Sequence, residues 1–87
     1  MQASFEISCY PLQEDFLGPI QNFIDRLNEY PEIKVLTNGM STQIFGDFQE
    51  VMRILTLEME NTMQNPHTLF VMKIANATLD SYTATAK

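Results

Sequence analysis

Hydrophobic and polar residues alternate near the start of the chain. Residues 5–10 read Phe-Glu-Ile-Ser-Cys-Tyr, so Phe5, Ile7 and Cys9 share one face and the polar residues share the other. A period of two is typical of a strand with one buried face. The sequence therefore predicts a half-buried strand that ends at Pro11.

Two later segments carry apolar residues at intervals of three and four, as amphipathic helices do. The first has a candidate N-cap at Asp15, contains Gly18 and Pro19 in its first turn, and stops by Pro31. Its apolar stripe comprises Phe16, Leu17, Ile20, Phe23, Ile24, Leu27 and Tyr30. The second helix is predicted from a capping-box-like start, Asp47 to Glu50, until Asn65-Pro66. Its buried stripe comprises Phe48, Val51, Met52, Leu55 and Met59, whereas Glu58 and Glu60 are expected on its solvated face.

A hairpin is predicted between these helices. The runs 33–37 and 40–46 flank Asn38-Gly39, and an Asn-Gly pair favours a two-residue turn with positive φ at both residues. With this turn, Val35 would oppose Thr42 and Ile33 would oppose Ile44. These four side chains would face the helices, and the intervening ones would face away: Lys34, Leu36, Ser41, Gln43 and Phe45.

The segment 69–75 is densely apolar and predicts a last strand covered on both faces. Residues 79–87 show no clear period and are expected to form a loosely held tail. At 87 residues the chain is expected to be one domain with one core, residues 1–87.

The order strand, helix, strand, strand, helix, strand predicts a ferredoxin-like α+β fold, βαββαβ. Right-handed crossovers would place the first and third strands in the middle of a four-stranded antiparallel sheet, with both helices on one face. The helix-free face would then carry apolar Leu36, Phe45, Leu69 and Val71 around Ser8, Tyr10, Ser41 and Gln43. Such a face is larger than monomers usually expose, which predicts a homo-oligomer, a dimer or tetramer through sheet faces or edges. Either a dry interface or a pocket at the join would fit this pattern.

Charge and composition limit the classes of partner and chemistry that the chain can be expected to have. A net charge of −6 with five Lys and Arg residues disfavours nucleic acid as a partner. No apolar run approaches about 18 residues and no signal peptide is visible, so no membrane partner and a cytoplasmic location are expected. The lone Cys9 excludes an intramolecular disulfide, and no cluster of His, Cys or carboxylates predicts a metal site, a cofactor or a catalytic residue.

Three segments carry a family resemblance: residues 6–12, Glu-Ile-Ser-Cys-Tyr-Pro-Leu; residues 38–46, Asn-Gly-Met-Ser-Thr-Gln-Ile-Phe-Gly; and residues 70–74, Phe-Val-Met-Lys-Ile. In this order they resemble the thiamine-binding, YkoF-like family. The resemblance implies a ferredoxin-like domain that assembles through its sheets and binds thiamine or its hydroxymethylpyrimidine moiety without catalysing a reaction. It implies that the ligand lies near Ser8, Tyr10, Asn38, Met40, Ser41, Thr42 and Gln43. Some members carry two tandem domains, so a site built from two domains would here need a second subunit.

These residue types suit such a ligand. Ser, Asn and Gln side chains offer donors and acceptors to an aminopyrimidine, while Tyr10 or Phe45 could stack on its ring and Glu6 would favour the cationic thiazolium. Two alternatives remain at this stage. One is a ligand-free oligomeric interaction module, and the other is a ferredoxin-like dimeric enzyme acting on a small aromatic molecule, with His67 as its candidate base.

Overall fold

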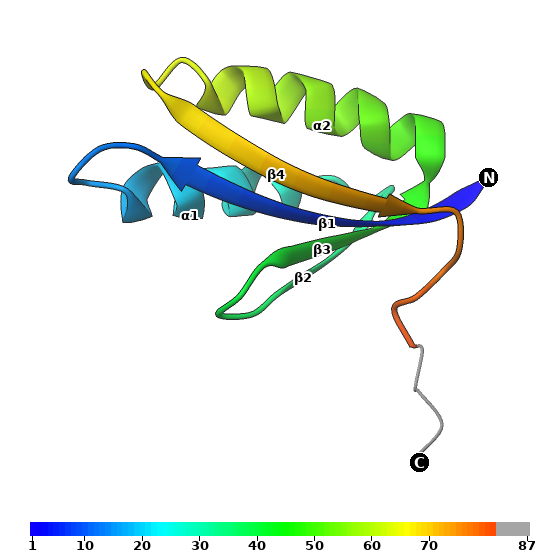
Figure 1. Ribbon diagram of the computed structural model, residues 1–87. Coiled ribbons are helices and arrows are strands. Elements are labelled where there is room, and N and C mark those ends of the chain that lie inside the picture. The colour runs from blue at the N-terminus through cyan, green and yellow to red at the C-terminus, as the bar shows by residue number, and fades with distance from the viewer. Residues whose placement is uncertain (82–87) are drawn as a thin grey trace, which may run out of the picture.

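The computed structural model describes residues 1–81 and has a ferredoxin-like α+β fold (Figure 1). The elements follow the predicted order: β1 (Gln2–Pro11), α1 (Leu17–Leu27), β2 (Lys34–Thr37), β3 (Thr42–Asp47), α2 (Phe48–Thr62) and β4 (Thr68–Ala75). Within these residues, neither helix combines the length and apolar character needed to cross a bilayer.

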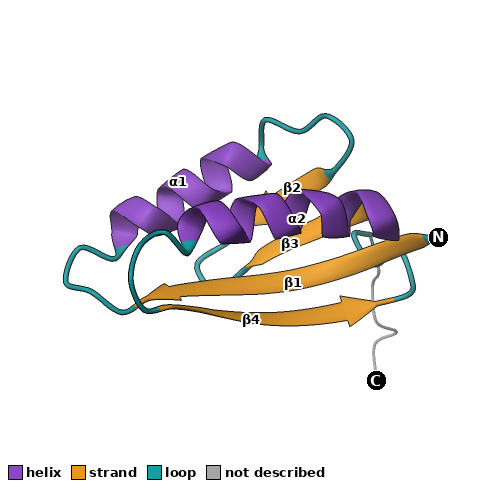
Figure 2. Cartoon of the chain, turned by 90° about the horizontal axis from the view of Figure 1, so that it is seen from above, coloured by secondary structure: helices purple, strands orange, loops and turns teal. Residues whose placement is uncertain are grey.

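The four strands form one antiparallel sheet in the order β2-β3-β1-β4. This order confirms the predicted central positions of β1 and β3. Both helices lie on the same face of the sheet, as predicted (Figure 2). The prediction that the last strand is covered on both faces is wrong. β4 is an edge strand whose alternate residues, including Leu69, Val71 and Lys73, are exposed.

The core lies between the helices and the central strands. Phe5, Ile7 and Ile44 of the sheet are buried against the helices. The helices contribute Phe23, Leu27, Val51, Ile54 and Leu55. Full burial of one such side chain stabilises a fold by roughly 1.5–3 kcal/mol, so this cluster fixes which face of each helix meets the sheet.

The two helices begin differently. The predicted cap of α2 is confirmed, because the Asp47 carboxylate accepts a hydrogen bond from the Glu50 amide at 3.3 Å. The predicted cap of α1 is wrong. Phe16, not Asp15, occupies the N-cap position and makes no side-chain capping bond, so α1 is held by its buried stripe rather than by its start.

The hairpin turn lies one residue further along the chain than predicted. Thr37 pairs with Thr42 and Val35 with Ile44, and the Asn38 amide donates to the Ser41 carbonyl at 3.1 Å. Gly39 and Met40 are therefore the central residues. No glycine among the described residues has positive φ, and instead the Asn38 side chain closes the turn by accepting from the Met40 and Ser41 amides at 2.8 and 3.1 Å.

The predicted faces of the hairpin are preserved although its register differs. Val35, for example, pairs with Ile44 rather than Thr42, a shift of two residues. Because side chains alternate between the faces with a period of two, a shift of two leaves each side chain on its predicted face. Thr42 and Ile44 are accordingly buried toward the helices, while Leu36 faces away and is exposed.

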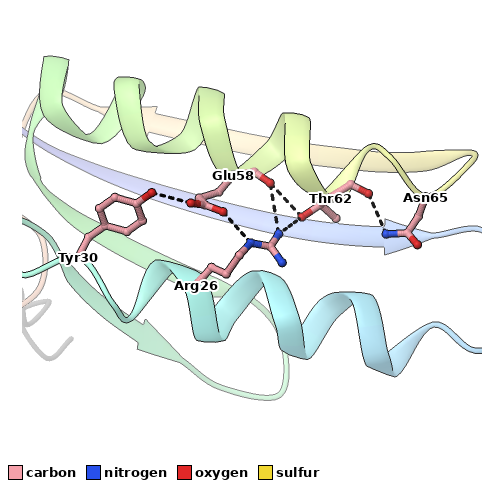
Figure 3. Close-up of polar contacts among 5 residues, drawn as sticks. All are labelled: Arg26, Tyr30, Glu58, Thr62 and Asn65. Carbon is pink, nitrogen blue, oxygen red and sulfur yellow. Dashed lines mark hydrogen bonds and ion pairs between the residues drawn. The ribbon is translucent and has the colours of Figure 1, made fainter.

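A polar network joins α1 to α2 (Figure 3). The Glu58 carboxylate accepts from Arg26 Nε at 2.6 Å and from the Tyr30 hydroxyl at 2.5 Å, and a second Arg26 nitrogen donates to Thr62 Oγ1 at 2.6 Å. Glu58 is buried, so its predicted place on the solvated face is wrong. The buried carboxylate is satisfied by two donors, Arg26 of α1 and Tyr30 of the loop that follows α1, which replace the water it loses.

The segment after β4, residues 76–81, crosses the helix-free face (Figure 1). Ser4 Oγ donates to the Ala77 carbonyl at 2.6 Å and accepts from the Leu79 amide at 2.9 Å, and Asp80 pairs with Lys34 at 3.0 Å. The sequence predicts a loosely held tail from residue 79, whereas Leu79 and Asp80 make these contacts; residues 82–87 lie outside the described part of the chain.

Candidate functional site

The site begins where β3 stops short of the end of β1. The β1–β3 ladder ends at Ile7 and Thr42, whereas the β1–β4 ladder continues to Pro11 and Thr68. The last four residues of β1 thus have a strand on one side and the hairpin turn, 38–41, on the other. The two chain segments separate here and leave a cleft.

The cleft has a volume of about 430 Å³, within the range of roughly 300–1,000 Å³ typical of small-molecule sites. The end of β1 and the loop after it form one wall, and the hairpin turn forms the other. Ile20, Phe23 and Ile24 of α1 close its base. The walls are mainly apolar, and the hydroxyls of Ser8 and Ser41 and the Asn38 amide are placed among them.

Six of the seven predicted ligand-binding residues line this cleft: Ser8, Tyr10, Asn38, Met40, Ser41 and Thr42. They differ in access. Met40 is 88% exposed at the tip of the turn and Tyr10 is half-exposed, whereas Thr42 is buried and faces the helices as its register predicts.

Gln43 does not line this cleft. It lies in a second depression of about 340 Å³ on the helix-free face, together with Glu6, Phe45 and Lys73. Glu6 connects the two regions, since its carboxylate accepts from Ser41 Oγ at 3.1 Å and lies 3.6 Å from Lys73 Nζ. We predicted a pocket on the helix-free face at a subunit join, but the larger cleft opens between α1 and the end of β1 within one chain.

The predicted interface residues divide into two groups. Leu36, Leu69 and Val71 are exposed on the helix-free face as expected. Phe45 is only 6% exposed, so its predicted exposure is wrong. It shares its depression with Leu79, and no pattern in the sequence predicts that Leu79 lies on the helix-free face.

The titratable groups near the cleft are few. Burial raises the pKa of the Cys9 thiol above its ordinary value, with Arg26 opposing the shift, so Cys9 is a protonated thiol at neutral pH. His67 lies outside the cleft lining, at a left-handed backbone position with φ 59° just before β4. Among residues 1–81, no three His, Cys, Asp or Glu side chains are grouped so that they could hold a metal ion.

Sequence reasoning missed the contribution of α1. Phe16, Ile20, Phe23 and Ile24 were assigned to the buried stripe, yet each also lines the cleft. Phe16 is 48% exposed at the rim.

The fold and the cleft together define a ferredoxin-like protein with a small-molecule-sized cavity beside its first strand. The model of the YkoF-related family matches residues 2–78, and the chain belongs to this family. No curated protein sequence is detectably similar to the chain.

Solved structures agree with the fold. A Streptococcus pneumoniae protein shares 26% sequence identity with a TM-score of 0.83, covering 93% of this chain and 92% of that one. A candidate thiamine biosynthesis/salvage protein of Thermotoga maritima has a TM-score of 0.80 at 18% identity, covering 88% of this chain and 85% of that one.

Proposed function

We propose that this protein binds thiamine, or its hydroxymethylpyrimidine moiety, in the cleft beside β1, and that it acts as a binding protein rather than an enzyme. The observation that carries the proposal is the convergence of six predicted ligand-binding residues on one cavity of suitable volume. Membership of the YkoF-related family and the thiamine-related description of the Thermotoga maritima protein support it.

The cleft offers both parts of such a ligand a suitable environment. The apolar base formed by α1 suits a planar ring, and Tyr10 and Phe16 place aromatic rings at the rim. The Asn38 side-chain oxygen is engaged by the turn, which leaves its NH₂ group as a donor. A cationic thiazolium at the rim would be favoured by the aromatic faces and by the net charge of −6.

Calorimetry with thiamine and with hydroxymethylpyrimidine tests this proposal. Loss of one hydrogen bond or one aromatic contact is worth roughly 0.5–1.5 kcal/mol, so Ser41→Ala and Tyr10→Ala should each weaken binding about two- to tenfold. Thr56→Ala, on the exposed side of α2 and away from the cleft, is the matched control and should bind as wild type does. Absence of heat from both compounds at millimolar concentration would refute the proposal.

We also propose that a second copy of the chain covers the helix-free face. Tyr10, Leu36, Leu69 and Val71 are each between 44% and 52% exposed there. The eight-residue strand β4 beside them has one edge that no strand among residues 1–81 pairs with. A two-fold pairing would cover the same patch on both copies at once.

Light scattering measures the mass directly. Val71→Lys should convert a dimer or tetramer into a monomer, while Leu57→Lys, at an equally exposed position on α2, should leave the mass unchanged. A wild-type chain that is monomeric at high concentration, or bound instead to an unlike partner, would contradict the self-association.

A further inference from the structure

Two hydrogen bonds fix the direction in which each backbone group of β1 points. In an antiparallel ladder, one residue directs its N–H and C=O to one neighbouring strand and the next residue directs them to the other. The Leu12 amide donates to the His67 carbonyl at 3.0 Å, so even-numbered residues of this strand face β4. The Phe48 amide donates to the Met1 carbonyl at 2.8 Å, so odd-numbered residues face β3.

Cys9 is the first odd-numbered residue beyond the end of the β1–β3 ladder. Continuing the register of Ile7 with Thr42 would pair Cys9 with Met40. Met40, however, belongs to the turn, where its amide is held by the Asn38 side chain at 2.8 Å. Within residues 1–81, no hydrogen bond reaches the Cys9 amide or carbonyl on this side. By the alternation of the ladder both groups point toward the hairpin, and Cys9 lines the cleft that separates the two.

The backbone also limits what can pair here. The next odd-numbered residue is Pro11, which has a carbonyl but no N–H. An added peptide strand pairs through a repeating series of N–H donors and C=O acceptors. This edge offers only the N–H and C=O of Cys9 and the C=O of Pro11. A small planar ligand therefore suits the edge better than an extended peptide does.

We infer that the main chain of Cys9 recognises the ligand, and that the class of ligand is a planar heterocycle with a ring-nitrogen acceptor next to an exocyclic amine. The Cys9 N–H donates to the ring nitrogen and the Cys9 C=O accepts from the amine, so the ligand takes the place of the missing β3 residue. This inference rests on the proposed function, and an aminopyrimidine has this edge. A buried backbone group without a partner destabilises the bound state, which makes the contact selective.

The ligand side of the inference is tested by calorimetry on the full chain. The probes are hydroxymethylpyrimidine, the same ring with hydrogen in place of the amine, and the same ring with a dimethylamino group. Both analogues lack the amine N–H that donates to the Cys9 carbonyl and would leave this carbonyl unpaired. We therefore expect both to bind roughly 10- to 100-fold more weakly than hydroxymethylpyrimidine. Analogues that bind within about threefold of the parent compound overturn the inference and leave the proposed function intact.

The role of the Cys9 main chain is tested by comparing ligand binding by Cys9→Pro with ligand binding by Cys9→Ala. Proline removes the N–H that faces the cleft, but it removes no bond to β4, because that N–H does not belong to the β1–β4 ladder. Alanine changes the same side chain and keeps the amide. We expect Cys9→Pro to bind hydroxymethylpyrimidine roughly 10- to 100-fold more weakly than Cys9→Ala, with the fold checked by circular dichroism.

A second readout covers the case in which Cys9→Pro fails to fold. In isotope-labelled wild-type protein, the Cys9 amide resonance should move downfield and exchange more slowly when hydroxymethylpyrimidine is added. Equal binding by the two Cys9 variants, or an unchanged Cys9 amide at saturation, overturns the inference. If neither hydroxymethylpyrimidine nor thiamine binds wild-type protein, the proposed function fails and the inference fails with it.

Discussion

Removal of the Glu58 carboxylate should destabilise the protein strongly, although Glu58 lies outside the cleft. Glu58→Ala deletes the acceptor of both Arg26 and Tyr30, and the side chains of Glu58 and Arg26 are only 11% and 27% exposed. The substitution leaves Arg26 with a carbonyl and a hydroxyl in place of a counter-charge.

The magnitude follows from these contacts. Hydrogen bonds to charged groups contribute roughly 1.5–3 kcal/mol each, and removal of one partner of a buried ion pair costs about 3–5 kcal/mol. Because water reaches part of Arg26, we expect a loss of about 2–4 kcal/mol, a large share of the roughly 5–15 kcal/mol that stabilises a typical protein.

Urea titration followed by circular dichroism measures this loss. Glu60→Ala, two residues along the same helix and exposed, is the control and should change the free energy of unfolding by less than about 0.5 kcal/mol. Replacing Arg26 and Glu58 together by leucine should cost less than the sum of the two single replacements, since no unpaired charge remains. Equal losses for Glu58→Ala and Glu60→Ala would show that the network does not join the helices.

Three further changes probe other contacts. Ser4→Ala removes two of the hydrogen bonds that hold residues 76–81 and leaves the Lys34–Asp80 ion pair, so it should speed amide exchange at Leu79 while leaving β1 protected; unchanged exchange would show that Ser4 does not hold the segment. The hydrogen bond to Glu58 raises the pKa of Tyr30, so it stabilises the fold below the pKa of free tyrosine, about 10, and is lost as pH rises through the folded-state pKa. The difference in unfolding free energy between wild type and Tyr30→Phe should therefore shrink at alkaline pH, and a constant difference would refute this. Gly46→Ala would place a Cβ 3.2 Å from a Val51 methyl, and thermal unfolding should show a loss of roughly 1–3 kcal/mol, whereas Gly39→Ala meets no atom within 4 Å and should be far milder.

The periodic patterns predicted the fold well. The period of two in β1 and the stripe of α2 each predicted the face that meets the core, because burial of Phe5 or Leu55 outweighs every local preference nearby. The hairpin faces were also predicted, although the turn was not. Asn38 was expected to supply positive φ, but its side chain instead accepts two hydrogen bonds, and Asn serves both purposes in turns.

Features set by distant partners were not predictable from local patterns. In the sequence, Glu58 resembles any exposed helix carboxylate; only the fold places Arg26 of α1 and Tyr30 of the following loop opposite it. Phe45 is buried where residues 76–81 cross the helix-free face, and that path is held by Ser4 Oγ and by the Lys34–Asp80 ion pair. Six of the residues that line the cleft were named through a family resemblance, but the α1 residues were not. The position of the cleft between α1 and the end of β1 depends on where the β1–β3 ladder stops.

The early end of the β1–β3 ladder has a consequence for variation among related chains. Two additional residues on each arm of the hairpin would carry the ladder past Ser8 to Cys9, so that protein would occupy the space beside β1. Loss of residues from both arms would instead widen the opening. None of the turn residues 38–41 has a buried side chain, so insertions and deletions in the turn would change which molecules fit while the rest of the fold stays the same.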